Sequence, residues 1–540
     1  MGRITNDGVN AYTYDSNHRL ATIAKGGKTL TYEYNGFNEI TGVTYNDFSN
    51  NKVSYTYDAN GNILTKVYPG SKTVTYTYDN LNRMKTVKDW NNNTITYTYL
   101  KDNRLSSVSY PNGMTVTYAY DNAGRQTGKT IKRQNNTIIA SYSFTLDNGG
   151  NIINETHTEP YGDVTLTTGA TSYSYNNANR ITSAGSINFT FDANGNTKTR
   201  GSSTYNYDNL DKLTSGDGFT FEYDGLGNIR SNGTKRYMID VLGIGNVIAE
   251  TNMSGTPTAY YLYGAGVLEA RILPNGTTHY YVSDYRGSVV AMVDATTSAN
   301  ITHKYQYDDF GNITQKQESD ENAFRYVGKY GVMYVNDNLY YMRARFYDPA
   351  IGRFLSEDPI WSTNLYPYAD NNPVMRIDPR GENTFQSYVS NGIENLKLGA
   401  EVIKDIFTGN HDEAYKKEKE KVISNMSQSK GIQYAMDNIK YAILEIGSDP
   451  MLLDLVNMLN PLDLESIIDK QIYDEKELTK LIGKNGYVPF GIDMRTKLGR
   501  QLKKIWGNVS AIKSAYGLKQ WSDKYSSEVE NLIYYYLYNK

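Results

Sequence analysis

The chain of 540 residues contains no cysteine, which excludes disulfides and cysteine-ligated metals and suits a secreted protein without stray thiols. It has no run of 18 apolar residues, so we expect no membrane-spanning helix. Basic and acidic residues nearly cancel to a net charge of −3, which gives the whole chain no electrostatic bias toward nucleic acid. The length is sufficient for about two to four domains with a sizeable core.

The N-terminal stretch, MGRITNDGVNAYTYD, lacks a basic segment followed by an apolar run. We therefore expect no secretory signal peptide there. Because the chain opens within a repeat, we expect either part of a longer protein or the cargo of a dedicated export machine. Whether the repeat region is complete or a fragment stays open at this point.

Phenylalanine and tryptophan are scarce, at 14 and 4 residues, whereas tyrosine occurs 51 times. A tyrosine has an apolar ring and a polar tip, so it suits a half-buried strand. The tyrosines follow a repeated pattern of aromatic-x-aromatic-Asp/Asn, a turn, and Asn/Arg-Ile/Leu. Copies of the pattern begin at Tyr12, Tyr32, Tyr55, Tyr76, Tyr97, Tyr118, Phe144, Tyr173, Phe189, Tyr205, Phe221 and Tyr305. The spacing is 21 residues from Tyr55 to Tyr118 and 16 from Tyr173 to Phe221, which indicates a repeat architecture.

Each copy predicts a β-hairpin. Tyr55 and Tyr57 are two residues apart and should share one face of a strand. Residues 58–61, Asp-Ala-Asn-Gly, provide turn chemistry, and residues 62–65 begin the return strand. Tyrosines of neighbouring hairpins would then pack across strands. We interpret these tyrosines as structural residues that build a wall.

The segment 324–381 contains five motifs in order: YYMRARFYDP, GRFLSEDP, NLYPY, NNPV and DPRG. Together with the repeats, it closely resembles the RHS/YD-repeat proteins and their RHS-associated core. That family includes polymorphic toxins and is related to the shell subunits of insecticidal toxin complexes, bacterial wall-associated proteins and teneurins. The resemblance implies a mainly β fold in which a spiralling antiparallel shell of hairpins is plugged by the core and holds a C-terminal toxic domain.

The resemblance also implies a division of the chain. Residues 1–323 would be the YD-repeat shell, 324–381 the core, and 382–540 a separate, variable C-terminal effector. Helical periodicity after residue 381, as in IENLKLGAEVIKDIF, predicts that the effector is all-α.

In the family, the core is thought to be an intramolecular aspartyl protease with two Asp-Pro motifs and an arginine. The matching residues here are Asp358, Asp378 and Arg345, and the cleavage region would be Gly381, Glu382 and Asn383. Two carboxylates that share a proton can activate water against a peptide bond. The family cuts after leucine in DPxGL, whereas Glu382 occupies that position here. Cleavage near the bond from Glu382 to Asn383 is therefore one prediction, and a plug that does not cut is the alternative.

Two weak candidates for effector chemistry occur in 382–540. His411, Asp412 and Glu413 form a run that fits either acid–base or metal chemistry, or a helix cap followed by a solvated helix. The second candidate is a basic helical face that fits either contact with phosphate or an ordinary polar outer surface. It consists of Lys497, Arg500 and Lys504.

The sequence thus predicts a segment of an RHS-repeat toxin whose effector is released by autoproteolysis and has nuclease or other toxic activity. The alternatives are a non-toxic cell-surface protein that binds glycans, and a helical tail that only docks or binds an immunity protein. Expected partners are the C-terminal domain as cargo, a cognate immunity protein, and export machinery or target-cell glycans. Nucleic acid is expected only for 382–540. We expect no cofactor or metal, and a secreted or cell-surface location in a bacterium.

Overall fold

The computed structural model describes residues 4–48, 52–163, 171–359, 364–382 and 385–386. Those from residue 8 onward belong to one compact unit, which is described here by itself. The unit is built of antiparallel strands, with two short 3-10 helices among the described residues, η1 (Gly328–Tyr330) and η2 (Tyr368–Asn371). The mainly β prediction is confirmed. The predicted all-α domain lies outside the described residues.

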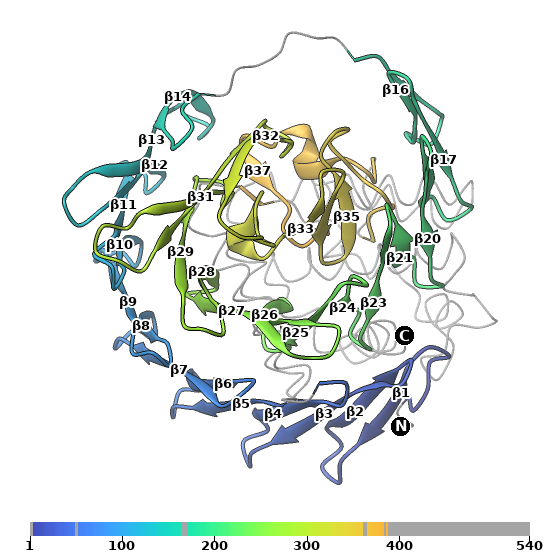
Figure 1. Cartoon of the computed structure of the whole chain (residues 1–540), viewed down its shortest axis with the longest axis horizontal. Coiled ribbons are helices and arrows are strands. Elements are labelled where there is room, and N and C mark those ends of the chain that lie inside the picture. Colours follow the sequence, from blue (N-terminus) through green and yellow to red (C-terminus); the bar gives the residue numbers. More distant parts are fainter. Residues whose placement is uncertain (1–3, 49–51, 164–170, 360–363, 383–384, 387–540) are drawn as a thin grey trace, which may run out of the picture. The chain divides into compact units, whose positions relative to one another are not determined.

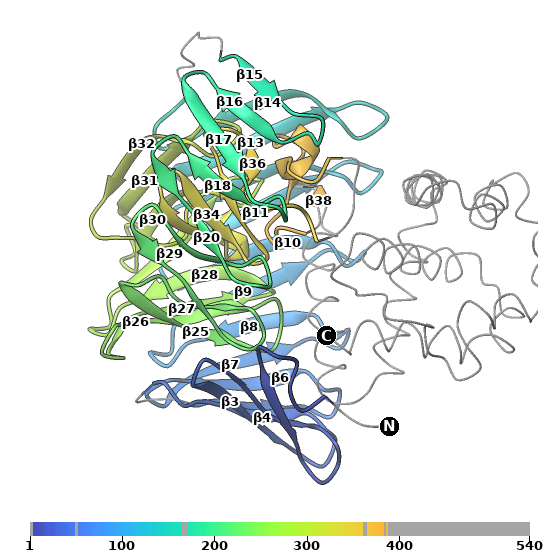
Figure 2. The same cartoon turned by 90° about the vertical axis from the view of Figure 1, so that its right-hand side faces the viewer.

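Fourteen strands form the first large sheet, and each pairs with the next along the chain. They are β1 (Ala11–Tyr14), β2 (Leu20–Lys25), β3 (Lys28–Tyr34), β4 (Ile40–Tyr45), β5 (Lys52–Tyr57), β6 (Ile63–Tyr68), β7 (Lys72–Tyr78), β8 (Met84–Lys88), β9 (Thr94–Tyr99), β10 (Leu105–Ser109), β11 (Thr115–Tyr120), β12 (Gln126–Lys132), β13 (Ile138–Leu146) and β14 (Ile152–Thr158). Figure 2 shows these strands in succession from β3 to β14.

Two small sheets follow in the chain. The first contains β15 (Tyr173–Tyr175), β16 (Ile181–Ala184), β17 (Ile187–Phe191), β18 (Thr197–Arg200) and β19 (Ser203–Thr204), and the second contains β20 (Asn206–Tyr207), β21 (Leu213–Gly216) and β22 (Phe219–Thr220).

The second large sheet has ten strands, again in chain order. They are β23 (Glu222–Tyr223), β24 (Ile229–Ser231), β25 (Lys235–Asp240), β26 (Asn246–Asn252), β27 (Pro257–Gly264), β28 (Val267–Ile272), β29 (Thr278–Ser283), β30 (Val289–Asp294), β31 (Ile301–Tyr307) and β32 (Ile313–Glu318). The core segment then adds β33 (Met333–Asn336), β34 (Leu339–Met342), β35 (Arg345–Asp348), β36 (Arg353–Phe354) and β37 (Arg376–Ile377). β38 (Phe385–Gln386) follows the core segment and pairs with β37.

The hairpin prediction is confirmed at the repeat that begins at Tyr55. Its turn is closed by the side chain of Asp58, whose Oδ1 accepts the backbone N–H groups of Asn60 at 2.9 Å and Asn62 at 2.8 Å. Gly61 takes the left-handed conformation that this turn requires, with φ of 78°. On the exposed face of β5, opposite the buried Tyr55, the hydroxyl groups of Thr56 and Thr65 are hydrogen-bonded across the hairpin at 2.6 Å.

In five repeats, the second tyrosine joins its hairpin to the preceding one. A register shift lies between Thr56 and Tyr57 in β5 and recurs between Thr77 and Tyr78 in β7. After this bulge, the Tyr78 hydroxyl donates to the carbonyl of Ile63, at 2.9 Å. The same bond recurs from Tyr34 to Leu20, Tyr57 to Ile40, Tyr99 to Met84, and Tyr120 to Leu105. These tyrosines are therefore structural ties between repeats.

In the repeats that begin at Tyr32, Tyr55, Tyr76 and Tyr97, the first tyrosine is buried in a core between the two large sheets. The Tyr55 hydroxyl donates to Asp240 Oδ1 of β25 at 2.8 Å. Further along, the hydroxyls of Tyr97 and Tyr110 donate to the two carboxylate oxygens of Glu269 in β28, at 2.8 and 2.5 Å. Between neighbouring hairpins, the ammonium group of Lys66 lies 5.8 and 5.9 Å from the ring centroids of Tyr55 and Tyr76. The buried hydroxyls of Tyr55, Tyr97 and Tyr110 thus find polar partners within the core.

A second core lies on the other face of the ten-stranded sheet and is shared with residues 324–377. Figure 1 shows the ten-stranded sheet between the fourteen-stranded sheet and strands β33 and β35. Because both faces of this sheet are covered, β28 and β29 are buried at every position. No helix among the described residues is long and apolar enough to cross a membrane.

Candidate autoproteolytic site

The three residues that the resemblance assigns to autoproteolysis lie together in the core segment. Arg345 begins β35, Asp358 follows β36, and Asp378 follows β37. One atom of the guanidinium group, Nη2 of Arg345, is 2.6 Å from Oδ2 of Asp358 and 3.4 Å from Oδ2 of Asp378. Residues that are 33 positions apart in the chain therefore meet at one nitrogen atom.

The peptide group between Gly381 and Glu382 is held at the same place. Nε of Arg345 donates to the Gly381 carbonyl at 2.5 Å, and the backbone N–H of Glu382 donates to Oδ1 of Asp378 at 3.2 Å. Gly381 has a φ of 66°, which favours glycine at the turn after Asp378. Both polar groups of this peptide are consequently bonded to predicted site residues.

The segment that precedes this peptide is fixed by the loop before β35. The backbone N–H of Ala344 donates to the carbonyl of Arg380 at 3.0 Å, and Arg343 Nη1 donates to the carbonyl of Pro379 at 2.6 Å. Nε of Arg343 also donates to the carbonyl of Ile244, between β25 and β26, at 2.6 Å. Arg343 thus ties the cleavage region to the ten-stranded sheet.

Arg345 is held by more than its ionic partners. Its guanidinium carbon lies 3.6 Å from the ring centroid of Phe354, and Nη1 donates to the carbonyl of Leu365 at 2.9 Å. The same carbonyl accepts the backbone N–H of Asp358 at 3.0 Å. Burial lowers the pKa of Arg345, and the charges of Asp358 and Asp378 oppose that shift. The arginine is a fixed, pre-organised donor.

The two carboxyl groups differ in access to water. The side chain of Asp378 is 3% exposed, whereas that of Asp358 is 17% exposed. Two carboxylates beside one guanidinium carry a net charge of −1, so a shared proton would make the group neutral. Because Arg345 contacts both carboxylates, this arrangement suits acid–base chemistry rather than binding of a metal cation.

The other predicted site residues divide into two sets. Gly381 and Glu382 lie beside Arg345 and Asp378, as described above. A larger set lies outside the described residues and consists of Asn383, His411, Asp412, Glu413, Lys497, Arg500 and Lys504. The catalytic role of every site residue stays a prediction.

Sequence reasoning missed three contributors to this site: Arg343, the ring of Phe354 and the carbonyl of Leu365. Only Arg343 left a signal in the sequence, since two arginines flank one alanine in MRARF. That spacing puts both side chains near the same bend of the chain.

The comparisons with known proteins concern the repeats and the core. The family model described as teneurin YD-shell matches residues 2–135 and 126–375. The tRNA3(Ser)-specific nuclease WapA of Bacillus spizizenii is 38% identical over 147 residues, which are 25% of this chain and 6% of that protein. The double-stranded DNA deaminase toxin A of Burkholderia cenocepacia is 41% identical over 64 residues, 11% of this chain and 4% of that protein. The chain thus spans only a small part of each relative.

One solved structure with a similar arrangement of elements is that of TcdB2-TccC3-TEV. The alignment covers 69% of this chain and 27% of that chain, with 15% sequence identity and a TM-score of 0.45.

Proposed function

Since the chain belongs to the teneurin YD-shell family and is an RHS/YD-repeat protein with a toxin-type shell, we propose that its core cuts the chain beside Glu382. The cut would separate the shell and core from the residues that follow. The observation that carries this proposal is the peptide group of Gly381 and Glu382, whose carbonyl and N–H are bonded to Arg345 and Asp378.

The reaction is the hydrolysis of one peptide bond next to Glu382. One carboxylate of the pair Asp358 and Asp378 accepts a proton from water, and the water oxygen attacks the peptide carbonyl carbon. The other, protonated carboxyl group donates its proton to the departing amide nitrogen. Arg345 supports this step because its donors are held where negative charge develops near the cleavage region. The products are a new carboxyl terminus and a new amino terminus.

We further propose that the residues after the cut are a toxic effector and that the shell and core hold it until release. One relative is named as a tRNA nuclease and another as a double-stranded DNA deaminase toxin, which supports an effector that acts on nucleic acid. The protein would work outside the producing cell, and an immunity protein would protect that cell. The alternative, a non-toxic cell-surface protein that binds glycans or partners, has no comparable support.

Incubation of the purified full chain, followed by intact mass measurement, tests the cleavage. The wild type should yield a C-terminal fragment that begins at residue 382 or 383, whereas Asp358→Asn and Asp378→Asn should stay intact. Asp348→Asn is the matched control because Asp348, in β35, is buried like Asp378 but pairs with Arg200 instead, at 2.6 Å. A wild type that stays intact would refute the proposal.

Growth of bacteria that express the full chain tests the effector. We expect impaired growth with the full chain and normal growth with a chain that ends at Gly381. Equal growth with both, at equal protein levels, would show that residues 382–540 have no toxic activity in that host.

A further inference from the structure

Two of the five histidines in the chain come together on the ten-stranded sheet. His279 lies in β29 and His303 in β31, on the two sides of β30. Their ring centroids are 5.4 Å apart. Asp320, in the connection after β32, completes the group, and the ligand atoms of all three residues lie within 4.8 Å of one another.

The two buried histidines differ in the hydrogen bonds of their ring nitrogens. His303 is fully buried. Its Nε2 lies 2.8 Å from Oδ1 and 2.9 Å from the backbone carbonyl oxygen of Asp320, and its Nδ1 is bonded to the hydroxyl of Thr302 at 2.8 Å. His279 is 5% exposed, and its Nδ1 is buried without a hydrogen-bond partner among the described residues. A buried polar nitrogen without a partner costs free energy, so it needs an explanation such as a ligand.

We propose that His279, His303 and Asp320 bind a borderline transition-metal ion of the Zn²⁺ class. The donors are two imidazole nitrogens and one carboxylate oxygen, a set that Zn²⁺ and Co²⁺ accept and that leaves a position for a fourth ligand. Ca²⁺ and Mg²⁺ require mostly oxygen ligands and should not bind here.

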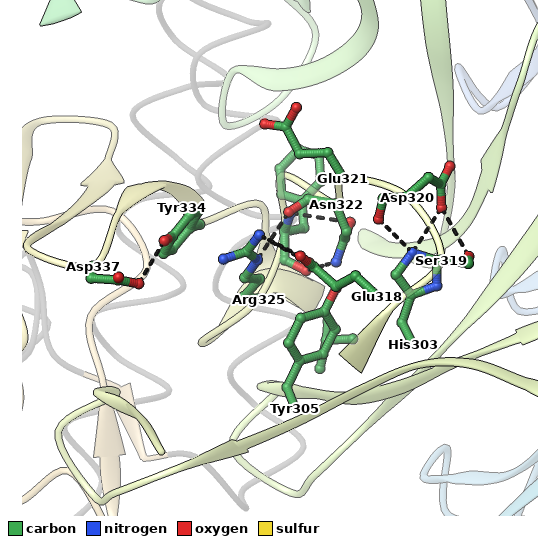
Figure 3. A network of polar contacts seen from close by, with 12 residues as sticks. His303, Tyr305, Glu318, Ser319, Asp320, Glu321, Asn322, Arg325, Tyr334 and Asp337 are labelled. Atoms are coloured by element: carbon green, nitrogen blue, oxygen red, sulfur yellow. Dashed lines mark hydrogen bonds and ion pairs between the residues drawn. The ribbon is translucent and has the colours of Figure 1, made fainter. Parts of the chain in front are cut away.

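Arg271 serves this site as a positioning residue. Its Nη2 is bonded to Oδ2 of Asp320 and its Nη1 to the carbonyl of Glu321, so it fixes the carboxylate while Oδ1 faces His303. Figure 3 shows His303 and Asp320 pointing toward each other. Such outer contacts commonly orient metal-binding carboxylates.

The position of the site suggests what the ion would do. Residues 319–322 connect β32 to the core segment. This connection is bonded to the ten-stranded sheet, because the hydroxyl of Tyr281 in β29 donates to Oδ1 of Asn322 at 2.9 Å. On the two sides of this connection, Arg325 pairs with Glu318, the last residue of β32, at 2.9 Å, as Figure 3 also shows. A metal ion bound by His279 of β29, His303 of β31 and Asp320 would fix this connection to the sheet. The side chain of Asp320 is 37% exposed, which gives the ion a route from solvent.

The test uses the full chain after treatment with a chelator and Co²⁺ as a spectroscopic probe. We expect visible d–d absorption from bound Co²⁺ that saturates at one equivalent of Co²⁺ per chain. Zn²⁺ should displace the Co²⁺ and remove the absorption, whereas excess Mg²⁺ should leave it unchanged. Zn²⁺ should also raise the thermal unfolding midpoint. His279→Gln and Asp320→Asn should each abolish the absorption, and Asp320 is exposed enough for its variant to fold.

The matched control is His157→Gln. His157 also lies near two carboxylates, at 3.3 Å from Glu155 and from Asp163, but belongs to the edge strand of the other large sheet. This variant should keep the Co²⁺ spectrum of the wild type. Absence of absorption in the wild type, or absorption that survives both His279→Gln and Asp320→Asn, would overturn the proposal.

Discussion

The ammonium group of Lys66 and the carboxylate of Asp240 form a buried ion pair that joins the two large sheets. The other carboxylate oxygen of Asp240 accepts the Tyr55 hydroxyl, so both oxygens are satisfied. A buried pair of this kind is costly to break because the remaining charge stays in the core.

Lys66→Met should therefore lower the free energy of unfolding by about 3–5 kcal/mol, since it leaves Asp240 charged and half-paired. The double variant Lys66→Met/Asp240→Asn should be less destabilised than Lys66→Met alone. Thermal unfolding midpoints of the full chain measure both effects. Lys52→Met is the control because Lys52 pairs with Glu33 at 2.7 Å with both side chains exposed, a contact worth about 0–1 kcal/mol. Equal losses in Lys66→Met and Lys52→Met would contradict the argument.

The tyrosine ties between hairpins make a second prediction. Tyr78→Phe removes only the hydroxyl that donates to Ile63, so it should cost about 1 kcal/mol. Hydrogen–deuterium exchange should then be about fivefold faster in β6 and β7, and unchanged in β25. Tyr173→Phe, at an exposed position, should leave exchange unaffected. Uniform acceleration across both large sheets would argue against a local tie.

The repeats were predictable because each hairpin keeps its own local signals. The turn aspartate, the left-handed residue and the alternating tyrosines all act within about twenty residues, as at Tyr55–Gly61. The hairpins of β25–β26, β27–β28 and β29–β30 were missed between Phe221 and Tyr305. Strands such as β28, VLEARI, are buried on both faces and so lose the alternation that marks the other repeats.

The two candidate sites differ in how far sequence could predict them. Arg345, Asp358 and Asp378 were predicted only through motifs of a known family, since Asp-Pro alone is ordinary turn chemistry. The cluster of His279, His303 and Asp320 gave no signal, because its members lie on separate strands and a connection. Their proximity depends on the register of β29, β30 and β31, in which His279 pairs with Asp294 and His303 with Met292. Sequence spacing alone does not encode that register.

Asp348 makes the stability of the shell depend on pH. Burial raises its pKa from 3.8 to about 6, although Arg200 lies 2.6 Å away and opposes the shift. The folded state therefore binds more protons than the unfolded state between about pH 4 and 6, so the contribution of Asp348 to stability falls as pH rises through that window. The advantage of the wild type over Asp348→Asn should shrink by up to about 3 kcal/mol from pH 4 to pH 7. Thermal midpoints of both proteins across this range are the measurement, and parallel curves would contradict the shifted pKa.

The geometry of Arg345 gives the sharpest prediction for cleavage. Its three nitrogens serve four acceptors: the Gly381 carbonyl from Nε, the Leu365 carbonyl from Nη1, and Asp358 and Asp378 from Nη2. A lysine keeps the positive charge but is a single point donor, so it cannot hold the Gly381 carbonyl and both carboxylates together. Arg345→Lys should slow cleavage about 10²–10³-fold, the usual effect of removing a donor that stabilises developing charge.

The control for this variant is Arg353→Lys, in the neighbouring strand β36. Arg353 also contacts backbone, with Nη1 at 3.3 Å from the carbonyl of Asn179, and its guanidinium carbon lies 4.7 Å from the ring centroid of Tyr175. Time courses of the C-terminal fragment on gels, with circular dichroism to verify folding, compare both variants with the wild type. Cleavage at the wild-type rate in Arg345→Lys would mean that a positive charge alone is sufficient for cleavage. Equal slowing in Arg353→Lys would mean that the effect arises from general packing of this region. Selective slowing in Arg345→Lys would instead require the forked geometry, because only the guanidinium reaches the carbonyl and the carboxylates at once.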